Sequence, residues 1–317
     1  MNFSKNFFLK HRLVVMNISR DLFVTEPGER LHTIEYYIEK FSVSRGTIQM
    51  AMQFLVENGC ISTQFCGHLG TFLLTKNTDR LWEFTGIGTL AGAMSIPLDT
   101  MTSGLATGIC DCMRAGDISF NCIFIHGSYA RVNSLLQGKC DFAIVTTLAY
   151  QVLRESHKNI KAIMDLPGCP YTARYVLLFK DPGKTKVEDG MTVSFDPTSV
   201  DQSYLTKLVS RNRKKIVFKR TPSFFNTRLS ITSGESDVTV VNTSVADSLG
   251  PDFKAHVKEL YLPEYAKEDV ERLRTPVILV LKDNYGLDAL LKQTLNTGII
   301  SRSQKGVMTG TQLPNYY

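Results

Sequence analysis

The sequence lacks the cysteine pattern of a protein held together by disulfides or zinc. Its seven cysteines are an odd number, form no C-x-x-C motif, and stand mostly among apolar neighbours. An odd, scattered set of this kind argues against a disulfide or zinc framework. We therefore expect buried, reduced thiols, which fit a reducing compartment.

Long apolar segments are missing as well. The run Val277–Leu281 is far shorter than the ~20 residues that a transmembrane helix needs. Apolar residues near the start of the chain are interrupted by Lys10, His11 and Arg12, and no small-residue cleavage site follows, so we expect no signal peptide. These absences predict a cytoplasmic protein with no membrane partner.

The sequence also lacks the spaced residues of a catalytic, cofactor or metal site. Gly86–Ala91 match G-x-G-x-x-A, but Pro97 would break the helix that a dinucleotide site needs after this turn. Gly183–Thr185 form no P-loop, because Leu178 stands where the first glycine is required. No H-E-x-x-H motif occurs. We expect neither an enzyme nor a bound cofactor or metal.

A strong excess of basic charge is absent too. The formal net charge is +6, which a solvated surface with a few extra lysines explains equally well. Residues 1–76 hold 8 lysines and arginines and 6 acidic residues. Any DNA binding by this region must therefore depend on a few placed side chains and not on a diffuse basic field.

The first 76 residues do contain an ordered series of elements. Residues 1–25 read as a helix, and two shorter helices begin after Thr33 and Ser44, which are suitable N-caps. Gly59 suits the left-handed end of the third helix, and two β-prone stretches follow, joined by the glycine turn at 67–70. This order predicts a winged helix-turn-helix domain over residues 1–76, followed by a polar linker.

From residue 77 onward, apolar strands alternate with helices, which predicts an α/β domain with mostly parallel sheets. The alternation restarts after a polar crossover near 181–187, and a late strand returns at 274–281. Such a pattern is typical of two lobes with the chain passing between them twice. We predict a second domain over residues 77–317, with lobe one at about 82–182 and 274–317 and lobe two at about 187–270.

The stretch from Pro27 to Leu73 carries the most specific motif of the chain. Ser42–Thr47 span the turn, and Gly67–Phe72 form the wing. This stretch resembles the winged helix-turn-helix of GntR-family transcription regulators, and the resemblance implies binding to operator DNA. Two departures concern the family's Pro-Ser-Glu-like segment, replaced here by Leu31–Glu35, and its usual arginine, replaced by Gln49.

The residues expected to contact DNA lie at the start of the third helix and around the wing. A helix N-terminus carries partial positive charge, Arg45 can pair with phosphate or guanine, and Gln49 can pair with adenine. The alternative is that Ser44 and Thr47 only cap the helix, that Arg45 is solvated, and that His68 is a turn residue. The predicted set is Arg30, Ser44, Arg45, Gly46, Thr47, Gln49 and His68.

The second domain carries a motif of its own. Gly127–Arg131 and Leu135–Ile144 resemble the core of type-2 periplasmic-binding-protein-like domains, which form the effector domains of LysR-type regulators and many solute receptors. Val193–Leu205 and Gly234–Val238 agree with this resemblance in the second lobe. The two domains together resemble the YhfZ-type regulators.

The predicted ligand site lies in the cleft between the lobes, where strands end and helices begin. Hydroxyl and amide groups there favour a small polar ligand, with anions among the candidates. Each residue is equally expected as a helix cap, and Asp196 and Asp201 as cation ligands or caps. The predicted set is Gly127, Ser128, Arg131, Thr146, Thr147, Asp196, Thr198, Ser199, Asn242 and Thr243.

These features together favour a ligand-responsive transcription regulator. We expect a homodimer on a palindromic operator, because two half-sites require two-fold symmetry. Closure of the lobes on a small-molecule effector would shift the population of DNA-competent dimers. The alternatives are an enzyme with a DNA-binding head and a second domain that serves only dimerisation.

Overall fold

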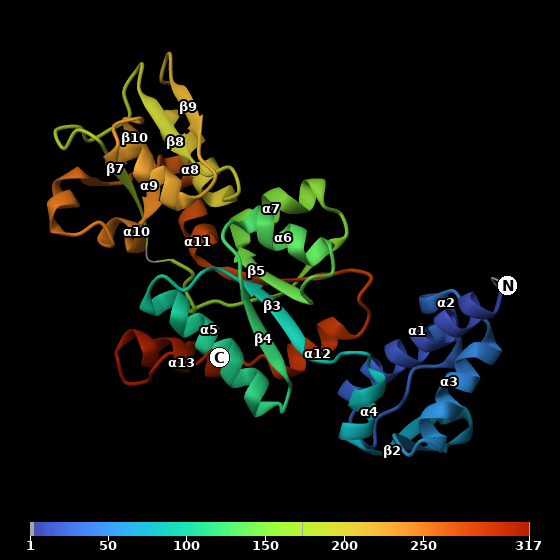
Figure 1. Ribbon diagram of the computed structural model, residues 1–317. Helices are drawn as coiled ribbons and strands as arrows, with labels where there is room; N and C mark the ends of the chain where they lie inside the picture. The colour runs from blue at the N-terminus through green and yellow to red at the C-terminus, as the bar shows by residue number, and fades with distance from the viewer. Residues whose placement is uncertain (1–2, 173, 317) are drawn as a thin grey trace. The chain divides into compact units, whose positions relative to one another are not determined.

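The computed structural model describes residues 3–172 and 174–316, which form two compact units. Unit 1 holds Met1–Leu90 and Asp283–Thr294, and unit 2 holds Ala91–Lys282 and Leu295–Tyr317 (Figure 1). The chain therefore leaves unit 1, builds most of unit 2, returns to unit 1 for a short segment, and ends in unit 2.

Unit 1 has the predicted order of helix, helix, turn, helix and hairpin, with two further helices packed on it. The hairpin strands pair antiparallel, and a 3-10 turn at Gly67–Leu69 joins them. Its helices and strands are α1 (Phe3–Val24), α2 (Ile34–Phe41), α3 (Arg45–Glu57), β1 (Ile61–Phe65), β2 (Thr71–Lys76), α4 (Thr78–Phe84) and α12 (Leu287–Thr294).

Local capping explains where the short helices of unit 1 begin and end. The Thr33 hydroxyl accepts from the Tyr36 amide, and the Ser44 hydroxyl accepts from the Thr47 amide, so both predicted N-caps are confirmed. Gly59 has a φ of +65°, the left-handed conformation that ends α3 as predicted. The helix-turn-helix is thus defined by residues close together in the sequence.

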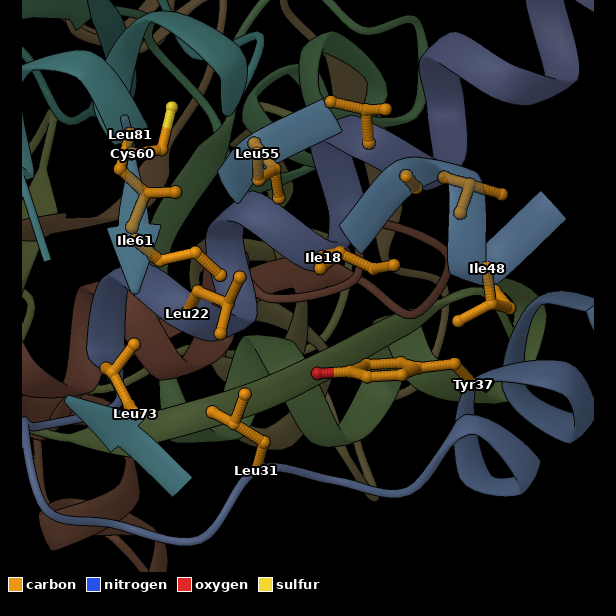
Figure 2. Close-up of a cluster of buried hydrophobic side chains, with 13 residues drawn as sticks. Ile18, Leu22, Leu31, Tyr37, Ile48, Leu55, Cys60, Ile61, Leu73 and Leu81 are labelled. Atoms are coloured by element: carbon orange, nitrogen blue, oxygen red, sulfur yellow. The ribbon is translucent and has the colours of Figure 1, made fainter. Parts of the chain in front are cut away.

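The core of unit 1 is one cluster of apolar side chains between α1, the other helices and the hairpin (Figure 2). Ile18 and Leu22 of α1 are completely buried and lie among Ile48 and Leu55 of α3 and Leu73 of β2. Figure 2 shows the ring of Tyr37, from α2, in the same cluster. Burial of these side chains fixes α3 with its opposite face toward solvent.

The segment expected as a linker is instead part of unit 1. Asn77 caps α4, and Leu81 of α4 is completely buried in the unit 1 core. The compact unit therefore continues to Leu90, beyond the predicted boundary at residue 76. Gly86–Ala91 connect helix α4 to strand β3, the reverse of the strand-to-helix order of a dinucleotide site.

Lobe one of unit 2 is a five-stranded sheet in the order β4-β3-β5-β12-β6 with helices packed against it (Figure 1). β3 pairs with β5 in parallel, whereas β12 pairs antiparallel with both β5 and β6. Its elements are β3 (Leu90–Met94), α5 (Thr100–Ala115), β4 (Phe120–Phe124), α6 (Ser128–Leu136), β5 (Phe142–Thr146), α7 (Thr147–Ser156), β6 (Ile160–Asp165), β12 (Pro276–Leu281) and α13 (Thr297–Met308).

Lobe two is a second five-stranded sheet, in the order β11-β7-β10-β8-β9. β8 pairs in parallel with β9 and β10, and β7 pairs antiparallel with β10 and β11. Its elements are β7 (Tyr175–Phe179), β8 (Thr192–Phe195), α8 (Val200–Ser210), β9 (Val217–Arg220), α9 (Phe224–Thr232), β10 (Val238–Asn242), α10 (Thr243–Asp247), 3-10 turns at Pro251–His256 and Glu264–Ala266, β11 (Val257–Glu259) and α11 (Asp269–Arg274).

Three predictions about unit 2 were wrong in detail. Lobe two begins at β7, near residue 175 and not 187, because β7 pairs with β10. The returning segment 283–294 packs with unit 1, since α12 contacts α1, so it is not part of lobe one. The sheets are mixed and not mostly parallel, because β7 and β12 run against their neighbours.

Helix α5 is held against α13 by close backbone packing. A Cβ atom at Gly104 would lie 2.8 Å from the Gln304 backbone, and one at Gly108 would lie 2.7 Å from the Ile300 backbone. Only glycine permits this approach, which fixes α5 and its N-terminal end in lobe one.

Among the described residues, no helix has both the length and the apolar character needed to cross a membrane.

Candidate functional site

The predicted DNA-contacting residues lie on one exposed end of α3 and around the hairpin. Arg45, Gly46 and Gln49 are exposed, and Ser44 precedes them as the exposed N-cap. Thr47 is half-buried, and its hydroxyl lies 2.9 Å from that of Ser44. The capping role of Ser44 is therefore real, and it leaves the neighbouring side chains of this turn in solvent.

Arg45 is paired with an acid of the preceding helix. One of its guanidinium nitrogens lies 2.8 Å from Glu35, and the two side chains are 61% and 60% exposed. Ion pairs at such exposed positions contribute roughly 0.2–1 kcal/mol. The pair holds the guanidinium at the tip of α3 and is weak enough to exchange for another anion.

The hairpin residues are also exposed, with one local constraint. Arg30 bridges to Phe72 of β2, and its guanidinium lies against the wing, because a Cβ at Gly70 would come within 2.8 Å of it. His68 is exposed in the 3-10 turn between the strands. A wing side chain and a helix-tip arginine are thus available to a groove and a phosphate backbone.

The second candidate site is a cavity of about 90 Å³ between the two lobes of unit 2. It is lined from lobe one by the β3–α5 and β4–α6 connections and from lobe two by α8 and the end of β10. Four helices, α5, α6, α8 and α10, begin next to this cavity, and several of their first amide groups are already bound by cap residues or by the other lobe. Of the predicted ligand residues, those lining it are Gly127, Ser128, Arg131, Ser199 and Asn242.

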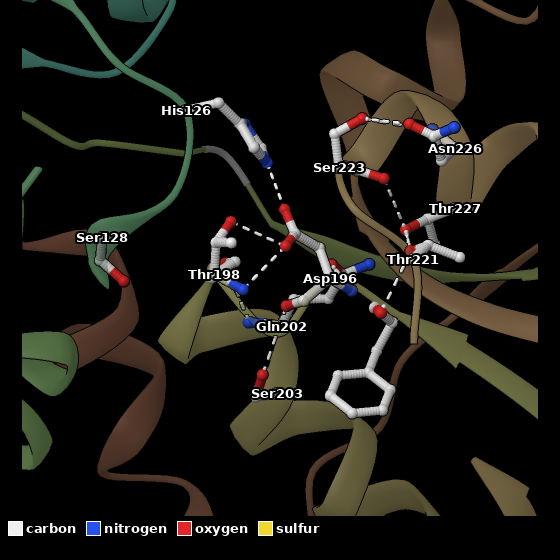
Figure 3. Close-up of polar contacts among 12 residues, drawn as sticks. His126, Ser128, Asp196, Thr198, Gln202, Ser203, Thr221, Ser223, Asn226 and Thr227 are labelled. Atoms are coloured by element: carbon white, nitrogen blue, oxygen red, sulfur yellow. Dashed lines mark hydrogen bonds and ion pairs between the residues drawn. The ribbon is translucent and has the colours of Figure 1, made fainter. Parts of the chain in front are cut away.

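Direct contacts hold the two lobes together beside this cavity (Figure 3). His126 Nε2 of lobe one lies 2.5 Å from the Asp196 carboxylate of lobe two. The Val200 amide donates to the Ser128 hydroxyl at 3.0 Å. A Cβ atom at Gly127 would lie 2.3 Å from Thr198 Oγ1, so glycine is required for this close approach.

The other predicted ligand residues do not line the cavity and form hydrogen bonds with neighbouring residues of the domain. Asp196 is completely buried and accepts from Thr198 as well as contacting His126. The Thr146 hydroxyl donates to Asp201 at 2.7 Å. Thr147 donates to the Thr275 carbonyl, and the Thr243 amide donates to the Arg174 carbonyl. Asn242, which does line the cavity, also caps α10. Thr146 and Asn242 accept hydrogen bonds as helix N-caps, which was the alternative role considered for them from the sequence.

Several lining residues were not in the predicted set. Asp99 and Thr102 form a capping box at the start of α5, a D-x-x-T signal that sequence reasoning could have used. Tyr171 and Thr172 lie in the segment that links the lobes and belong to no periodic pattern. Asp201, considered from the sequence as a cation ligand or a cap, also lines the wall, and the remaining missed residues are Ser95, Ile96, Leu98, His126, Tyr175, Gln202, Val240, Val241 and Val245.

The cavity wall contains a buried cation and a buried acid. Arg131 donates to the Ile144 and Ile125 carbonyls, each at 2.9 Å, and lies over the Tyr171 ring at 5.7 Å. Burial raises the pKa of Asp201 to about 6, against the opposing effects of the Thr146 hydrogen bond and the Arg131 charge. The buried acid therefore changes charge near pH 6.

One polar atom of the wall lacks a partner. Thr172 is 3% exposed, and its hydroxyl oxygen has no hydrogen-bond partner in the part of the chain that the structure describes. A buried hydroxyl without a partner costs free energy, on the order of 1–3 kcal/mol. A polar ligand in the cavity would supply the missing hydrogen bond. No group of three or more metal-ligating side chains is found within residues 3–172 and 174–316.

Comparison with known proteins agrees with this architecture. Residues 77–316 match the model of the YhfZ C-terminal domain, and residues 26–73 match a helix-turn-helix domain. The YhfZ protein of Escherichia coli (strain K12) is 25% identical over 328 residues, covering 98% of this chain and 99% of that protein. The helix-turn-helix match names no subclass, so the GntR type stays a prediction.

Solved structures show the same fold in the second unit. The crystal structure of YhfZ from Shigella flexneri aligns with a TM-score of 0.59 at 22% identity, over 74% of this chain and 96% of that one. The periplasmic aliphatic sulphonate binding protein SsuA from Escherichia coli aligns with a TM-score of 0.51 at 12% identity, over 70% and 75%. The two-sheet domain thus has the fold of periplasmic binding proteins. The match to the YhfZ C-terminal domain alone spans more than half of this chain, so the chain belongs to the YhfZ family.

Proposed function

We propose that this protein is a transcription regulator whose unit 1 binds duplex DNA and whose unit 2 responds to a small polar ligand. The helix-turn-helix domain and the YhfZ-type C-terminal domain indicate a DNA-binding regulator. The observation that carries the proposal is the exposed start of α3, where Arg45 and Gln49 lie in solvent while Ile48 between them is completely buried.

In this proposal, the tip of α3 enters the major groove. Arg45 exchanges its weak pair with Glu35 for a phosphate or a guanine, and the high negative charge density of duplex DNA favours this exchange. Gln49, one turn further along the exposed face, faces base edges. The wing, with Arg30 and His68, contacts the adjacent backbone or minor groove.

The assignment to the GntR type, a homodimeric state and a palindromic operator belong to the same proposal. Winged helices of this type read short half-sites, and two-fold symmetry supplies the second half-site. The proposal includes no catalytic step.

The ligand-responsive part rests on the cavity between the lobes of unit 2. Its wall offers four helix N-termini, the partnerless Thr172 hydroxyl, and the buried Arg131 and Asp201. Its small volume of about 90 Å³ and its polar wall fit a small polar molecule that the lobes enclose. A ligand that binds the closed lobes more tightly than the open ones shifts the population toward the closed state.

The test is the affinity of the full chain for a duplex that it selects from a random pool. Arg45→Ala should weaken binding by about 1–3 kcal/mol, the usual effect of losing one arginine contact. Arg302→Ala, an exposed position on α13 of unit 2, removes the same charge and should leave affinity unchanged. Equal losses in both variants, or none in Arg45→Ala, would argue against readout by α3.

A second arm of this experiment addresses the ligand. Metabolites that raise the melting temperature of the chain are added to the DNA titration, because a ligand of the folded state must stabilise it. A cleft effector should change the dissociation constant for DNA. A stabilising metabolite that leaves DNA affinity unchanged would show that ligand binding to the cavity does not regulate DNA binding.

A further inference from the structure

Two thiols of lobe one lie in contact, apart from either candidate site. The sulfur of Cys110 on α5 is 3.4 Å from the sulfur of Cys122 on β4, and the thioether of Met94 on β3 lies 3.7 Å from Cys122. Cys110 is 7% exposed, and Cys122 is half-buried, so small solutes can reach the pair. All seven cysteines of the chain are free thiols in this structure.

The backbone around the pair is fixed, so the contact does not depend on a flexible loop. Helix α5 packs against both β4 and α13, and Gly104 and Gly108 place α5 in backbone contact with α13. A disulfide needs a sulfur–sulfur distance of about 2.05 Å. The two sulfurs must therefore approach by about 1.4 Å, which rotation of the two side chains can supply.

The local chemistry favours one thiolate in the pair. The hydrogen bond with Cys122, in which either sulfur can be the donor, and the nearby charge of Arg114 lower the pKa of Cys110 despite its burial. The same interaction raises the pKa of Cys122. Burial raises the pKa of Cys140 and Cys169, so those thiols are less reactive. Because the thiolate is the nucleophile, Cys110 is placed to react first and Cys122 to resolve the product.

We propose that Cys110 and Cys122 are a reversible dithiol–disulfide pair that responds to peroxide. The Cys110 sulfur attacks one peroxide oxygen, the O–O bond breaks, and the leaving hydroxide takes a proton to give water and a Cys110 sulfenic acid. The Cys122 sulfur then attacks the Cys110 sulfur, the S–O bond breaks, and a second water leaves. Two thiols are oxidised, one hydrogen peroxide is reduced to two waters, and an external dithiol reverses the change.

The position of the pair would connect its redox state to the cavity. α5 begins at the capping box of Asp99 and Thr102, and both side chains line the cavity. β4 leads directly into His126 and Gly127 at the contact with lobe two. A disulfide between α5 and β4 would restrict the relative movement of these two cavity-lining segments. The disulfide itself does not depend on the proposed function.

The test uses the full folded chain treated with a small excess of hydrogen peroxide, then blocked and digested with trypsin without reduction. Cleavage after Arg80, Arg114 and Arg131 places Cys110 and Cys122 in separate peptides, 81–114 and 115–131. We expect mass spectrometry to find these two peptides joined, and dithiothreitol to separate them. In urea, the unfolded chain loses the contact between these two thiols. The Cys110–Cys122 disulfide should then form no more often than disulfides with the other five thiols.

Matched variants identify the sulfurs involved. Cys112→Ser changes the other cysteine of peptide 81–114 and should leave the cross-link, whereas Cys110→Ser should abolish it. If a variant fails to fold, fragmentation of the joined wild-type peptides between Cys110 and Cys112 in the mass spectrometer identifies the linked sulfur. The proposal is overturned if Cys110 and Cys122 stay reduced at a peroxide dose that oxidises the half-buried Cys66. A cross-link that survives in folded Cys110→Ser also overturns it.

Discussion

At the scale of single residues, Asp201 is the clearest case of a side chain whose charge depends on its surroundings. It is 7% exposed, accepts from Thr146, and has a pKa raised to about 6 by burial. An unfolded chain ionises such an acid near pH 3.9. The folded state therefore binds the proton more tightly, and ionisation of Asp201 destabilises the fold as the pH rises from about 4 to about 6.

Asp201→Asn should remove this dependence. We expect the variant to gain stability relative to wild type as the pH rises from about 4 to about 6, by up to about 3 kcal/mol for a shift of about two pKa units. Thermal unfolding of both chains from about pH 4 to pH 7.5 checks the trend. Asp252→Asn, at an exposed position of lobe two, controls for the loss of one carboxylate. A stability difference that stays constant with pH would contradict the account.

At the scale of elements, the segment before α12 contacts α1 through Arg20, and it contacts α2 through the side chain of Tyr285. The Tyr285 hydroxyl lies 3.3 Å from that of Tyr36 and donates to Asp21 at 3.2 Å. Its ring meets Phe41 edge-on at 5.0 Å and lies under the Lys40 ammonium. The polypeptide that leaves the strand β12 therefore supports α2, the first helix of the helix-turn-helix.

Tyr285→Ala should loosen α2. The half-buried ring loses its packing and two hydrogen bonds, a cost of about 2–4 kcal/mol by comparison with aromatic truncations. Hydrogen exchange of the α2 amides should accelerate in proportion. Tyr261→Ala, at an 81% exposed site, is the matched control and should leave α2 unchanged. Unaltered protection of α2 in Tyr285→Ala would show that this contact contributes nothing to the helix.

Elements defined by near neighbours could be predicted from the sequence, and those defined by distant pairing could not. The caps Thr33 and Ser44 and the left-handed Gly59 act within a few residues, so the limits of α2 and α3 were correct. The lobe in which β7 lies depends on pairing with β10, more than fifty residues further on. Nothing in the local pattern of β7 identifies that partner.

The same difference between local and distant contacts explains which residues of the candidate site could be predicted from the sequence. Gly127, Ser128 and Asn242 were predicted to line the cleft because strand-to-helix connections are visible in the sequence. Tyr171 and Thr172 reach the cavity only because the segment between β6 and β7 crosses between the lobes. Thr146 was predicted to follow a strand and to line the cleft, but it is the last residue of β5 and contacts Asp201 without lining the cavity, since only three-dimensional packing decides which side of a turn faces the cavity.

At the scale of the whole molecule, closure of unit 2 depends on close contact between its lobes. Gly127 has a φ of +81° and leaves no room for a Cβ beside Thr198. Gly138 has a similar φ of +66°, but a Cβ there would meet nothing within 4 Å. Both glycines therefore have a positive φ, and of the two only Gly127 lies in close contact with the other lobe.

Gly127→Ala should separate the lobes, whereas Gly138→Ala should not. Both variants place an alanine at a positive φ, which strains the backbone, and only Gly127→Ala adds a clash with Thr198. We expect faster hydrogen exchange in Gly127→Ala at the Tyr129 and Val200 amides, which donate across the lobes. Equal exchange at these amides in the two variants would contradict a closed contact at this point.

The central claim is that unit 1 binds duplex DNA through a few charged side chains, and the salt dependence of binding tests it most directly. The dissociation constant of the full chain for its selected duplex is measured from roughly 50 to 200 mM monovalent salt. We predict that the logarithm of the association constant falls linearly with the logarithm of the salt concentration. The slope should correspond to neutralisation of only a few phosphates. Failure to bind any duplex at the lowest salt, or an affinity that does not change with salt, would contradict the account.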